Sequence, residues 1–311
     1  MNKQQAPIRF ESLSAALHAL GLPSPQHPLI ALINGIDQPI AGTIPKERHV
    51  LDFYKISFRP FSGGALRYGQ THFDFNEGGL LFAAPNQIIG GEEAAMESMD
   101  DDGLKQQITV LIHPDFLMHH PLATKISQYG FFSYSVHEAL FLSEKEKETL
   151  LALLRTMEDE LSRPIDEISQ NVIIAQIELL LNYAQRFYKR QFITRKPLNN
   201  DLLEQLEMVL NEYFTTERPL QEGIPTVKHI AAQLNLSPGY LSDLLRTLTG
   251  EGAQQYIHNK LIEKAKEKLS TTTLSVGEIA YELGFEHPQS FSKLFKSKTR
   301  QSPLAFRARF H

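Results

Sequence analysis

The chain has 311 residues, of which 42% are hydrophobic and 22% are charged, which is typical of a globular protein of about two domains. It contains no cysteine, and this excludes disulfides, thiolate metal ligands and a cysteine nucleophile. No apolar run reaches the roughly 18 residues that a membrane-spanning helix needs, and the first residues lack the apolar core of a signal peptide. We therefore expect a cytoplasmic protein.

The net charge of −5 hides an asymmetry along the chain. Residues 1–224 hold 19 Lys and Arg against 29 Asp and Glu, whereas residues 225–311 hold 12 against 7. An acidic body followed by a basic segment indicates that the basic segment alone meets a polyanion.

Residues 51–112 are typical of β-structure. Short runs rich in aromatic and aliphatic residues alternate with turn signals made of glycine, proline and asparagine. The runs are LDFYKISF, GALRYG, THFDF, GGLLFAA and QQITVLIH. This spacing predicts a sandwich or a barrel, with the acidic residues 90–103 in a surface loop.

After His113 the pattern becomes helical. Ser143 and Glu146 have the spacing of a capping box and precede the apolar run LLALLRTMEDEL. A second long segment, from about Asp166 to Gln191, carries a wide apolar stripe. That stripe packs either on the β-domain or against the same helix of a second subunit, and we expect a homodimer formed through residues about 143–191. A polar linker is predicted at residues 193–200.

The last hundred residues contain an internal repeat. IAAQLNLSPGYLSDLLRTLTG begins at Ile230, and IAYELGFEHPQSFSKLFKSKTR begins at Ile279. Each copy has the pattern of a short helix, a tight turn and a second helix, with Ser237 and Ser275 as helix caps. Two such helices joined by a tight turn are the sequence form of a helix-turn-helix, although helical hairpins also occur in plain bundles.

The exposed face of the second copy favours DNA binding over a plain bundle. Phe291, Leu294 and Phe295 occupy the inward face of its second helix. The side chains left to face outward are His287, Gln289, Ser292, Lys293 and Lys296. Gln can bond an adenine edge, Lys can reach guanine or a phosphate, and Ser suits either kind of contact.

One helix is predicted between the copies, from about Gly252 to Leu269. At 1.5 Å per residue it spans about 27 Å. A strut of this length holds two helices near one DNA turn apart, about 34 Å, so that one chain can place both in the same face of the duplex.

These residues resemble the AraC/XylS family of bacterial transcription regulators. The resemblance covers roughly residues 200–310 and rests on the pattern IA-x3-GF-x5-F-x3-FK followed by SP-x2-FR. The positions that match are Ile279, Ala280, Gly284, Phe285, Phe291, Phe295, Lys296, Ser302, Pro303 and Arg307. The resemblance implies a seven-helix unit in which a long helix joins two helix-turn-helix motifs.

Four residues depart from the family pattern. Arg300 stands where glycine is usual, Phe306 replaces a tyrosine, and Lys260 replaces an arginine. Asp243 stands where a basic residue is common and would repel phosphate, so it puts the contribution of the first motif in doubt. Besides the residues of the second copy, the predicted DNA contacts are Ser237, Gly239, Ser242, Asp243, Arg246 and Lys260.

The N-terminal part resembles the cupin-type sensor domain of such regulators, which implies a small β-barrel with a helical dimerisation element. Cupin enzymes hold a metal through clustered histidines and a glutamate, but here only His72 lies in the expected region, with His49, Glu77 and His113 scattered. We therefore expect no metal and no cofactor. An effector in the barrel would meet aromatic side chains, for which the candidates are Phe53, Tyr54, Tyr68, Phe73 and Phe82.

The predicted fold class is α+β: a cupin-like sensor and dimerisation domain at residues 1–192, with its barrel at about 45–113, and an all-α DNA-binding domain at 201–311. The predicted function is that of a sequence-specific transcription regulator, not an enzyme, controlled by a small-molecule effector. It would contact double-stranded DNA and, if it is an activator, RNA polymerase. The alternatives are a constitutive DNA-binding regulator whose barrel only dimerises, and a cupin enzyme with a helical appendage.

Overall fold

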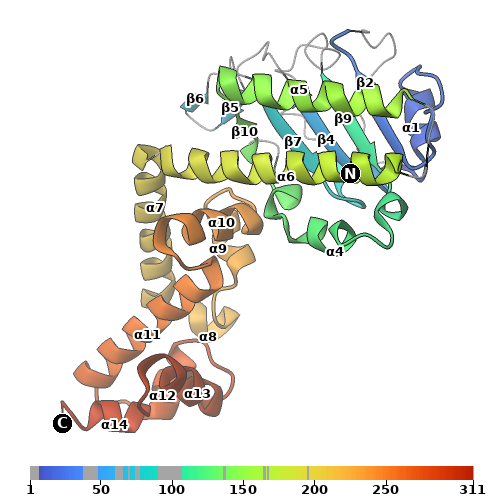
Figure 1. The fold of residues 1–311 in the computed structure, drawn as a ribbon. Helices are drawn as coiled ribbons and strands as arrows, with labels where there is room; N and C mark the ends of the chain where they lie inside the picture. The colour runs from blue at the N-terminus through green and yellow to red at the C-terminus, as the bar shows by residue number, and fades with distance from the viewer. Residues whose placement is uncertain are drawn as a thin grey trace, which may run out of the picture. The chain divides into compact units, whose positions relative to one another are not determined.

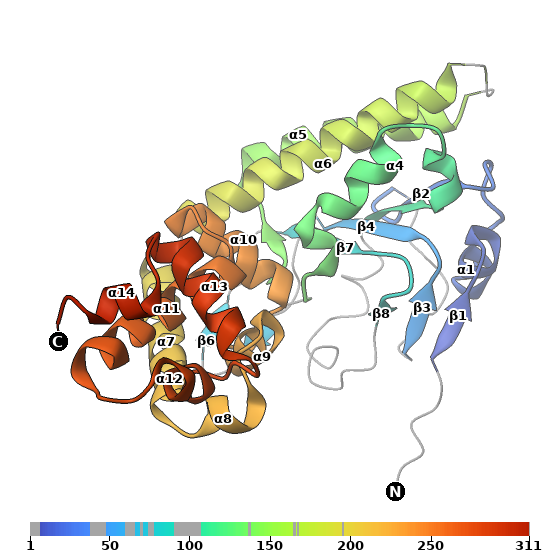
Figure 2. The same ribbon diagram turned by 90° about the horizontal axis from the view of Figure 1, so that it is seen from below.

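The computed structural model describes residues 7–37, 48–59, 66–68, 71–73, 78–89, 107–135, 138–163, 166, 168–194 and 196–310. The chain divides into two compact units, Met1–Gln191 and Phe192–His311. The first unit combines β-sheets with helices, and the second is helical (Figures 1 and 2).

The first unit is built on a five-stranded sheet with the order β10-β7-β4-β9-β2. All of its neighbouring strands run antiparallel. The strands are β2 (Ile30–Asn34), β4 (Tyr54–Arg59), β7 (Gly79–Ala83), β9 (Ile108–Ile112) and β10 (Leu140–Phe141). The runs at 54–59, 79–83 and 108–112 confirm the strands that the sequence predicts there, whereas β2 lies before the predicted start of the β-region.

Two smaller sheets accompany the central one, with the orders β1-β3-β8 and β5-β6. Their strands are β1 (Ile8–Phe10), β3 (His49–Leu51), β8 (Ile88–Ile89), β5 (Leu66–Tyr68) and β6 (Thr71–Phe73). Helix α1 (Leu13–Ala19) packs with this part of the unit. Within the described residues the strands form three separate sheets, so the predicted closed barrel is not observed and the cupin fold is not established.

One face of the five-stranded sheet is covered by helices (Figure 2). This face is apolar, with Ile56, Phe58, Leu80 and Phe82 buried on it. Tyr54, Ile56 and Phe58 alternate onto this face of β4, because successive side chains of a strand point to opposite sides. The helix η3 (Gly130–Ser133) supplies aromatic rings to it, with the ring of Phe82 4.4 Å from that of Phe131. This arrangement forms the main core of the unit.

Two long helices follow the sheet, after the shorter helices η1 (Pro114–Leu117), α4 (Leu122–Lys125) and η2 (Ile126–Gln128). They are α5 (Glu144–Leu161) and α6 (Ser169–Thr194). The predicted capping box is confirmed at the start of α5, where Ser143 and Glu146 each bond the backbone of the other. Helix α7 (Lys196–Thr215) begins two residues after α6 ends. Residues 196–200 of the predicted linker are therefore helical, and residue 195 lies outside the described residues.

The second unit continues α7 with a series of shorter helices around the long helix α11 (Figure 1). They are α8 (Arg218–Glu222), α9 (Val227–Gln233), α10 (Pro238–Thr249), α11 (Ala253–Thr271), α12 (Val276–Glu282), α13 (Pro288–Thr299) and α14 (Pro303–Arg307). Described residues 196–310 thus hold eight helices, one more than the resemblance implies, the shortest of them five residues long. One hydrophobic core joins all the larger helices.

Candidate nucleic-acid interface

Both predicted helix-turn-helix motifs are present, as α9–α10 and α12–α13. Ser237 caps α10 by accepting from the backbone N–H of Tyr240, and Pro238 occupies the first position of that helix. Ser275 and Glu278 form the predicted capping box of α12. These local signals explain why each helix begins where the sequence indicates.

The turn between α12 and α13 depends on Gly284. Its φ of +89° lies in the region that glycine adopts without strain. Asn235 holds the equivalent place in the first copy with a φ of +54°, and asparagine is among the few residues that tolerate this conformation. The two turns therefore have the same backbone geometry although only one contains glycine.

Helix α13, which we call the recognition helix, has distinct inner and outer faces. Phe291 and Phe295 are fully buried in the core, and Leu294 is partly buried against it. The exposed side chains of the helix and its flanks are His287, Gln289, Ser290, Lys293, Lys296, Ser297 and Arg300. Ser292 is only partly exposed. Ser290, absent from the sequence prediction, belongs to the outer face, and its place becomes visible only when the helix begins at Pro288.

The equivalent face of α10 is less open. Ser237 is buried and bound in the helix cap, and the hydroxyl of Ser242 donates to the backbone oxygen of Pro238. Gly239 is partly exposed in the first turn. Asp243 accepts a hydrogen bond of 2.7 Å from the guanidinium of Arg246, one turn further along the helix. The first copy thus presents an ion pair where the recognition helix presents two exposed lysines, Lys293 and Lys296.

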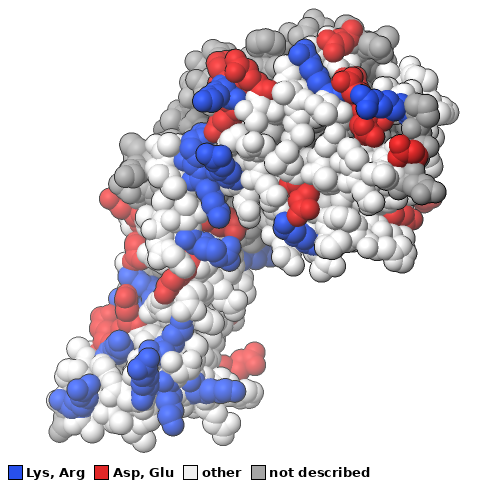
Figure 3. Space-filling model, viewed as in Figure 1, with Lys and Arg blue, Asp and Glu red and all other residues white. Residues whose placement is uncertain are grey.

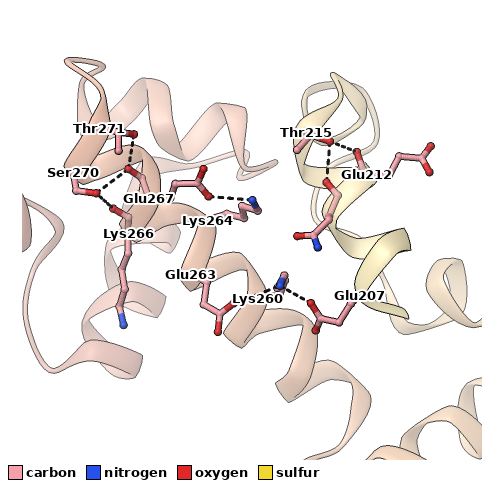
Figure 4. A network of polar contacts seen from close by, with 11 residues as sticks. Glu207, Glu212, Thr215, Lys260, Glu263, Lys264, Lys266, Glu267, Ser270 and Thr271 are labelled. Carbon is pink, nitrogen blue, oxygen red and sulfur yellow. Dashed lines mark hydrogen bonds and ion pairs between the residues drawn. The ribbon is translucent and has the colours of Figure 1, made fainter. Parts of the chain in front are cut away.

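Lys260, one of the predicted DNA contacts, is engaged within the second unit. It lies on α11 with a side chain only 16% exposed, and its ammonium group pairs with Glu207 of α7 at 2.5 Å (Figure 4). The hydroxyl of Tyr256 donates to the same carboxylate at 2.6 Å. Lys260 is therefore held in an ion pair between α7 and α11.

The charges of this network stabilise one another. The hydrogen bond to Glu207 raises the pKa of Lys260 above its ordinary value. Burial alone would raise the pKa of Glu207, but the hydrogen bonds from Lys260 and Tyr256 and the charge of Lys260 outweigh it, so that pKa is lowered. Both groups stay ionised at neutral pH.

Arg300 occupies the C-terminal cap of α13 with a φ of +63°, in the left-handed region. Gly250 has the same role at the end of α10, with a φ of +82°. A side chain in this conformation costs on the order of 1 kcal/mol relative to glycine. The left-handed backbone conformation at this position, where glycine is usual in the family pattern, is therefore adopted here by an arginine.

Helix α11 connects the two motifs and packs against α10, α12 and α13. Its 19 residues span about 28 Å at the ordinary rise of an α-helix. Lysine and arginine side chains gather over the part of this unit that α12, α13 and α14 occupy (Figure 3). The second unit thus combines two helix-turn-helix motifs, a long helix that connects them and a basic surface.

Of the described aromatic residues predicted for an effector pocket, Tyr54 and Phe82 lie together, whereas Phe53 lies on the other face of the sheet. Phe53 is fully buried with Leu13 and Leu111 in the cluster beside α1. Tyr54 and Phe82 lie on the opposite face of the sheet, each with its ring 5.1–5.3 Å from that of Phe132. The side chains of Tyr68 and Phe73 lie outside the described residues.

The described part of the chain contains no group of three or more side chains that could hold a metal ion, and none of its helices is long and apolar enough to cross a membrane. His49 is buried with its ring against that of Phe10. His113 accepts from the backbone of Asp115 at the start of η1. His72 and Glu77 fall outside what the structure describes of side chains.

Comparisons with known proteins agree with this geometry. The helix-turn-helix domain family matches residues 230–309. The uncharacterized HTH-type transcriptional regulator YfiF of Bacillus subtilis (strain 168) is 29% identical over 144 residues, which are 46% of this chain and 42% of YfiF. The Msm operon regulatory protein of Streptococcus mutans is 36% identical over 81 residues, which are 26% of this chain and 29% of that protein.

The crystal structure of the DNA-binding domain of AdpA, a global transcriptional factor, in complex with a target DNA is matched at 26% identity, over 35% of this chain and 91% of that one, with a TM-score of 0.30. The chain spans less than half the length of YfiF and of the Msm regulator. Residues 230–309 are therefore a helix-turn-helix domain, and the proteins that the chain resembles include transcriptional regulators.

Proposed function

We propose that the chain is a sequence-specific transcription regulator in which α13 supplies the principal base contacts. The exposed face of this helix carries the proposal, because Gln289, Lys293 and Lys296 are exposed on it while its other face is buried in the core. These side chains include the hydrogen-bonding groups that read base edges in the major groove. His287, Ser290 and Ser292 complete the set that we assign to this contact.

The first motif contributes less to affinity in this account. The ion pair between Asp243 and Arg246 neutralises the positive charge that would otherwise attract a DNA phosphate. Lys260 is committed to Glu207 and supports the position of α11. We propose that Gly239, Ser242 and Arg246 of the first motif contact the DNA backbone or bind DNA through water. Ser237 caps the helix of that motif.

The experiment that tests this function is selection of bound genomic DNA fragments by the purified full-length chain, followed by binding measurements at several salt concentrations. A regulator of this kind should enrich one motif and lose affinity steeply with salt, since each phosphate contact releases a counterion. Enrichment of no motif, or binding that salt leaves unchanged, would refute the proposal.

We further propose that two copies of the chain associate through α6. Val172 and Leu179 of this helix are 36% and 47% exposed, and Ile168, just before its first residue, is 65% exposed. Their spacing of four and seven residues is that of one helical stripe. Exposed apolar stripes are typical of helix–helix interfaces. Leu179→Lys should convert a dimer to a monomer in analytical ultracentrifugation, whereas a wild type that sediments as a monomer would contradict the proposal.

The role of the first unit is effector control: a small molecule that binds it would change how the DNA-binding domain is presented. Such control requires that the molecule bind one arrangement more tightly than another. A regulator whose first unit only dimerises is the alternative, and a metabolite that changes DNA affinity would exclude it.

A further inference from the structure

The second face of the five-stranded sheet has a polar centre. The side chains of Lys55, Ser57 and Arg59 alternate onto it from the central strand β4, opposite in direction to Tyr54, Ile56 and Phe58. The strand register places Thr109 of β9 directly beside Ser57. Gln107, just before β9, accepts a hydrogen bond of 3.0 Å from Nε of Arg59. Ordinary sheet cores carry apolar residues at such positions.

These polar groups are largely removed from water. Ser57, Gln107 and Thr109 are buried, and Lys55 and Arg59 are partly buried. Lys55 lies between Leu111 and Ala83 on its neighbouring strands, both of them buried. Burying a charge is unfavourable unless a partner of opposite sign compensates it.

Lys55 has no such partner in the part of the chain that the structure describes. Its ammonium group makes no hydrogen bond or ion pair there, and the charge that acts on it is that of Arg59, which has the same sign. Desolvation first and this repulsion second lower the pKa of Lys55 to about 8. Three donors of one ammonium group are therefore available on a buried face.

The hydroxyl groups beside it supply a further donor. Ser57 Oγ and Thr109 Oγ1 lie 3.1 Å apart and share one hydrogen bond. Two hydroxyl groups carry two hydrogens, so one hydrogen of the pair is left to donate elsewhere. Among the described residues nothing accepts it.

We propose that this face of the sheet binds the anionic group of a small molecule, a carboxylate or a phosphate, with Lys55 as the charged contact and the Ser57–Thr109 pair as a neutral donor. An anion there would compensate the buried ammonium group and accept the remaining hydroxyl hydrogen. This assignment rests on the proposed effector control and names the chemistry of the effector. It also places the effector on the face opposite to Tyr54 and Phe82.

The test compares thermal unfolding of the full chain with Lys55→Met and Lys55→Gln, and with Lys145→Met as a control at an exposed lysine of α5. Without additives, Lys55→Met should melt higher than the wild type, because it removes a buried charge that no described residue compensates, and Lys145→Met should not. A lower melting temperature for both Lys55 variants would show that Lys55 has a structural partner and would overturn the proposal.

The probes are octanoate, benzoate and inorganic phosphate. Octanamide and benzamide, the uncharged amides of the two carboxylates, are the controls. At millimolar concentrations at least one anion should raise the melting temperature of the wild type and of Lys145→Met by roughly 2–4 °C. The amides should not, and both Lys55 variants should lose the response. A response to carboxylates alone or to phosphate alone identifies the group that is bound.

Equal shifts for acid and amide, shifts that persist in the Lys55 variants, or no shift with any of the three anions would overturn the proposal. DNA binding is measured on the same samples. Lys55 variants that bind DNA like the wild type but show no shift with anions would support the proposed anion site. Anion binding by a chain that binds no DNA would refute the proposed function but would still support the anion site at Lys55.

Discussion

Gly284 and Gly223 meet backbone to backbone in the second unit. A Cβ placed on Gly284 would lie 2.5 Å from the carbonyl carbon of Gly223, closer than any real contact allows. The carbonyl oxygen of Gly223 also accepts a hydrogen bond of 2.9 Å from the hydroxyl of Tyr213 on α7. The turn of the second motif is thereby fixed to the segment that precedes the first.

This relationship predicts different costs for two glycine substitutions. Gly284→Ala should destabilise the second unit by about 3 kcal/mol or more, because a positive φ and a backbone overlap act together. Gly250→Ala is the matched control, since it has a φ of +82° but no atom within 4 Å of the added methyl group, and should cost about 1 kcal/mol. Urea unfolding monitored by helix circular dichroism measures both, and equal costs would contradict the observed contact.

Arg300 gives a prediction of the opposite sign. Arg300→Gly should stabilise the second unit by about 1 kcal/mol, because glycine adopts the left-handed cap of α13 without strain. Arg300→Ala keeps the strain and should not stabilise. A higher urea midpoint for both variants would point to removal of charge as the cause, and a lower midpoint for Arg300→Gly would refute the strain.

The pair of Lys260 and Glu207 should behave as a structural contact. A double-mutant cycle with Lys260→Met and Glu207→Gln should give a coupling of about 1 kcal/mol at pH 7. Because the folded-state pKa of Glu207 is lowered, this stabilisation is present above its ordinary pKa and is lost as the pH falls through the folded value. Urea midpoints of the four proteins at pH 7 and near pH 3 check it, and a coupling that grows in acid would contradict it.

Lys55 should leave a signature in alkaline solution. Its pKa is about 8 in the folded chain against an ordinary 10.5, so the unfolded chain binds more protons between these values. The stability of the wild type relative to Lys55→Met should therefore rise with pH from about 8 to about 10.5. Melting temperatures of both proteins across this range measure the difference. A relative stability that stays flat or falls there would show that the lysine is not desolvated.

The sequence predicts local features of the second unit well because their causes are local. The caps at Ser237 and Ser275 depend on residues three positions apart, and the structure confirms both; Ser302 caps α14 in the same way. The inward positions of Phe291 and Phe295 follow from helical periodicity and are likewise confirmed.

Features that depend on distant partners are not visible in the sequence. Lys260 pairs with Glu207, which is 53 residues away in the sequence, and no local pattern predicts that pairing. Strand β2 pairs with β9 across more than seventy residues. Pro28 and Asn34-Gly35 bound its run IALIN as turn signals, but they do not identify the partner strand. Lys55 lies within an apolar run, and only the register of three strands places it beside Leu111 and Ala83.

The central claim is that the exposed face of α13 reads base sequence. The direct test is selection from a random DNA library by the wild type, Gln289→Ala, Lys293→Ala and a control, Lys266→Ala, which alters an exposed lysine of α11 outside that face. The first two variants should each relax preference at one base position by about 1–3 kcal/mol, with their unfolding unchanged, and the control should retain the wild-type motif. Motifs and affinities left unchanged by both α13 substitutions would contradict the claim.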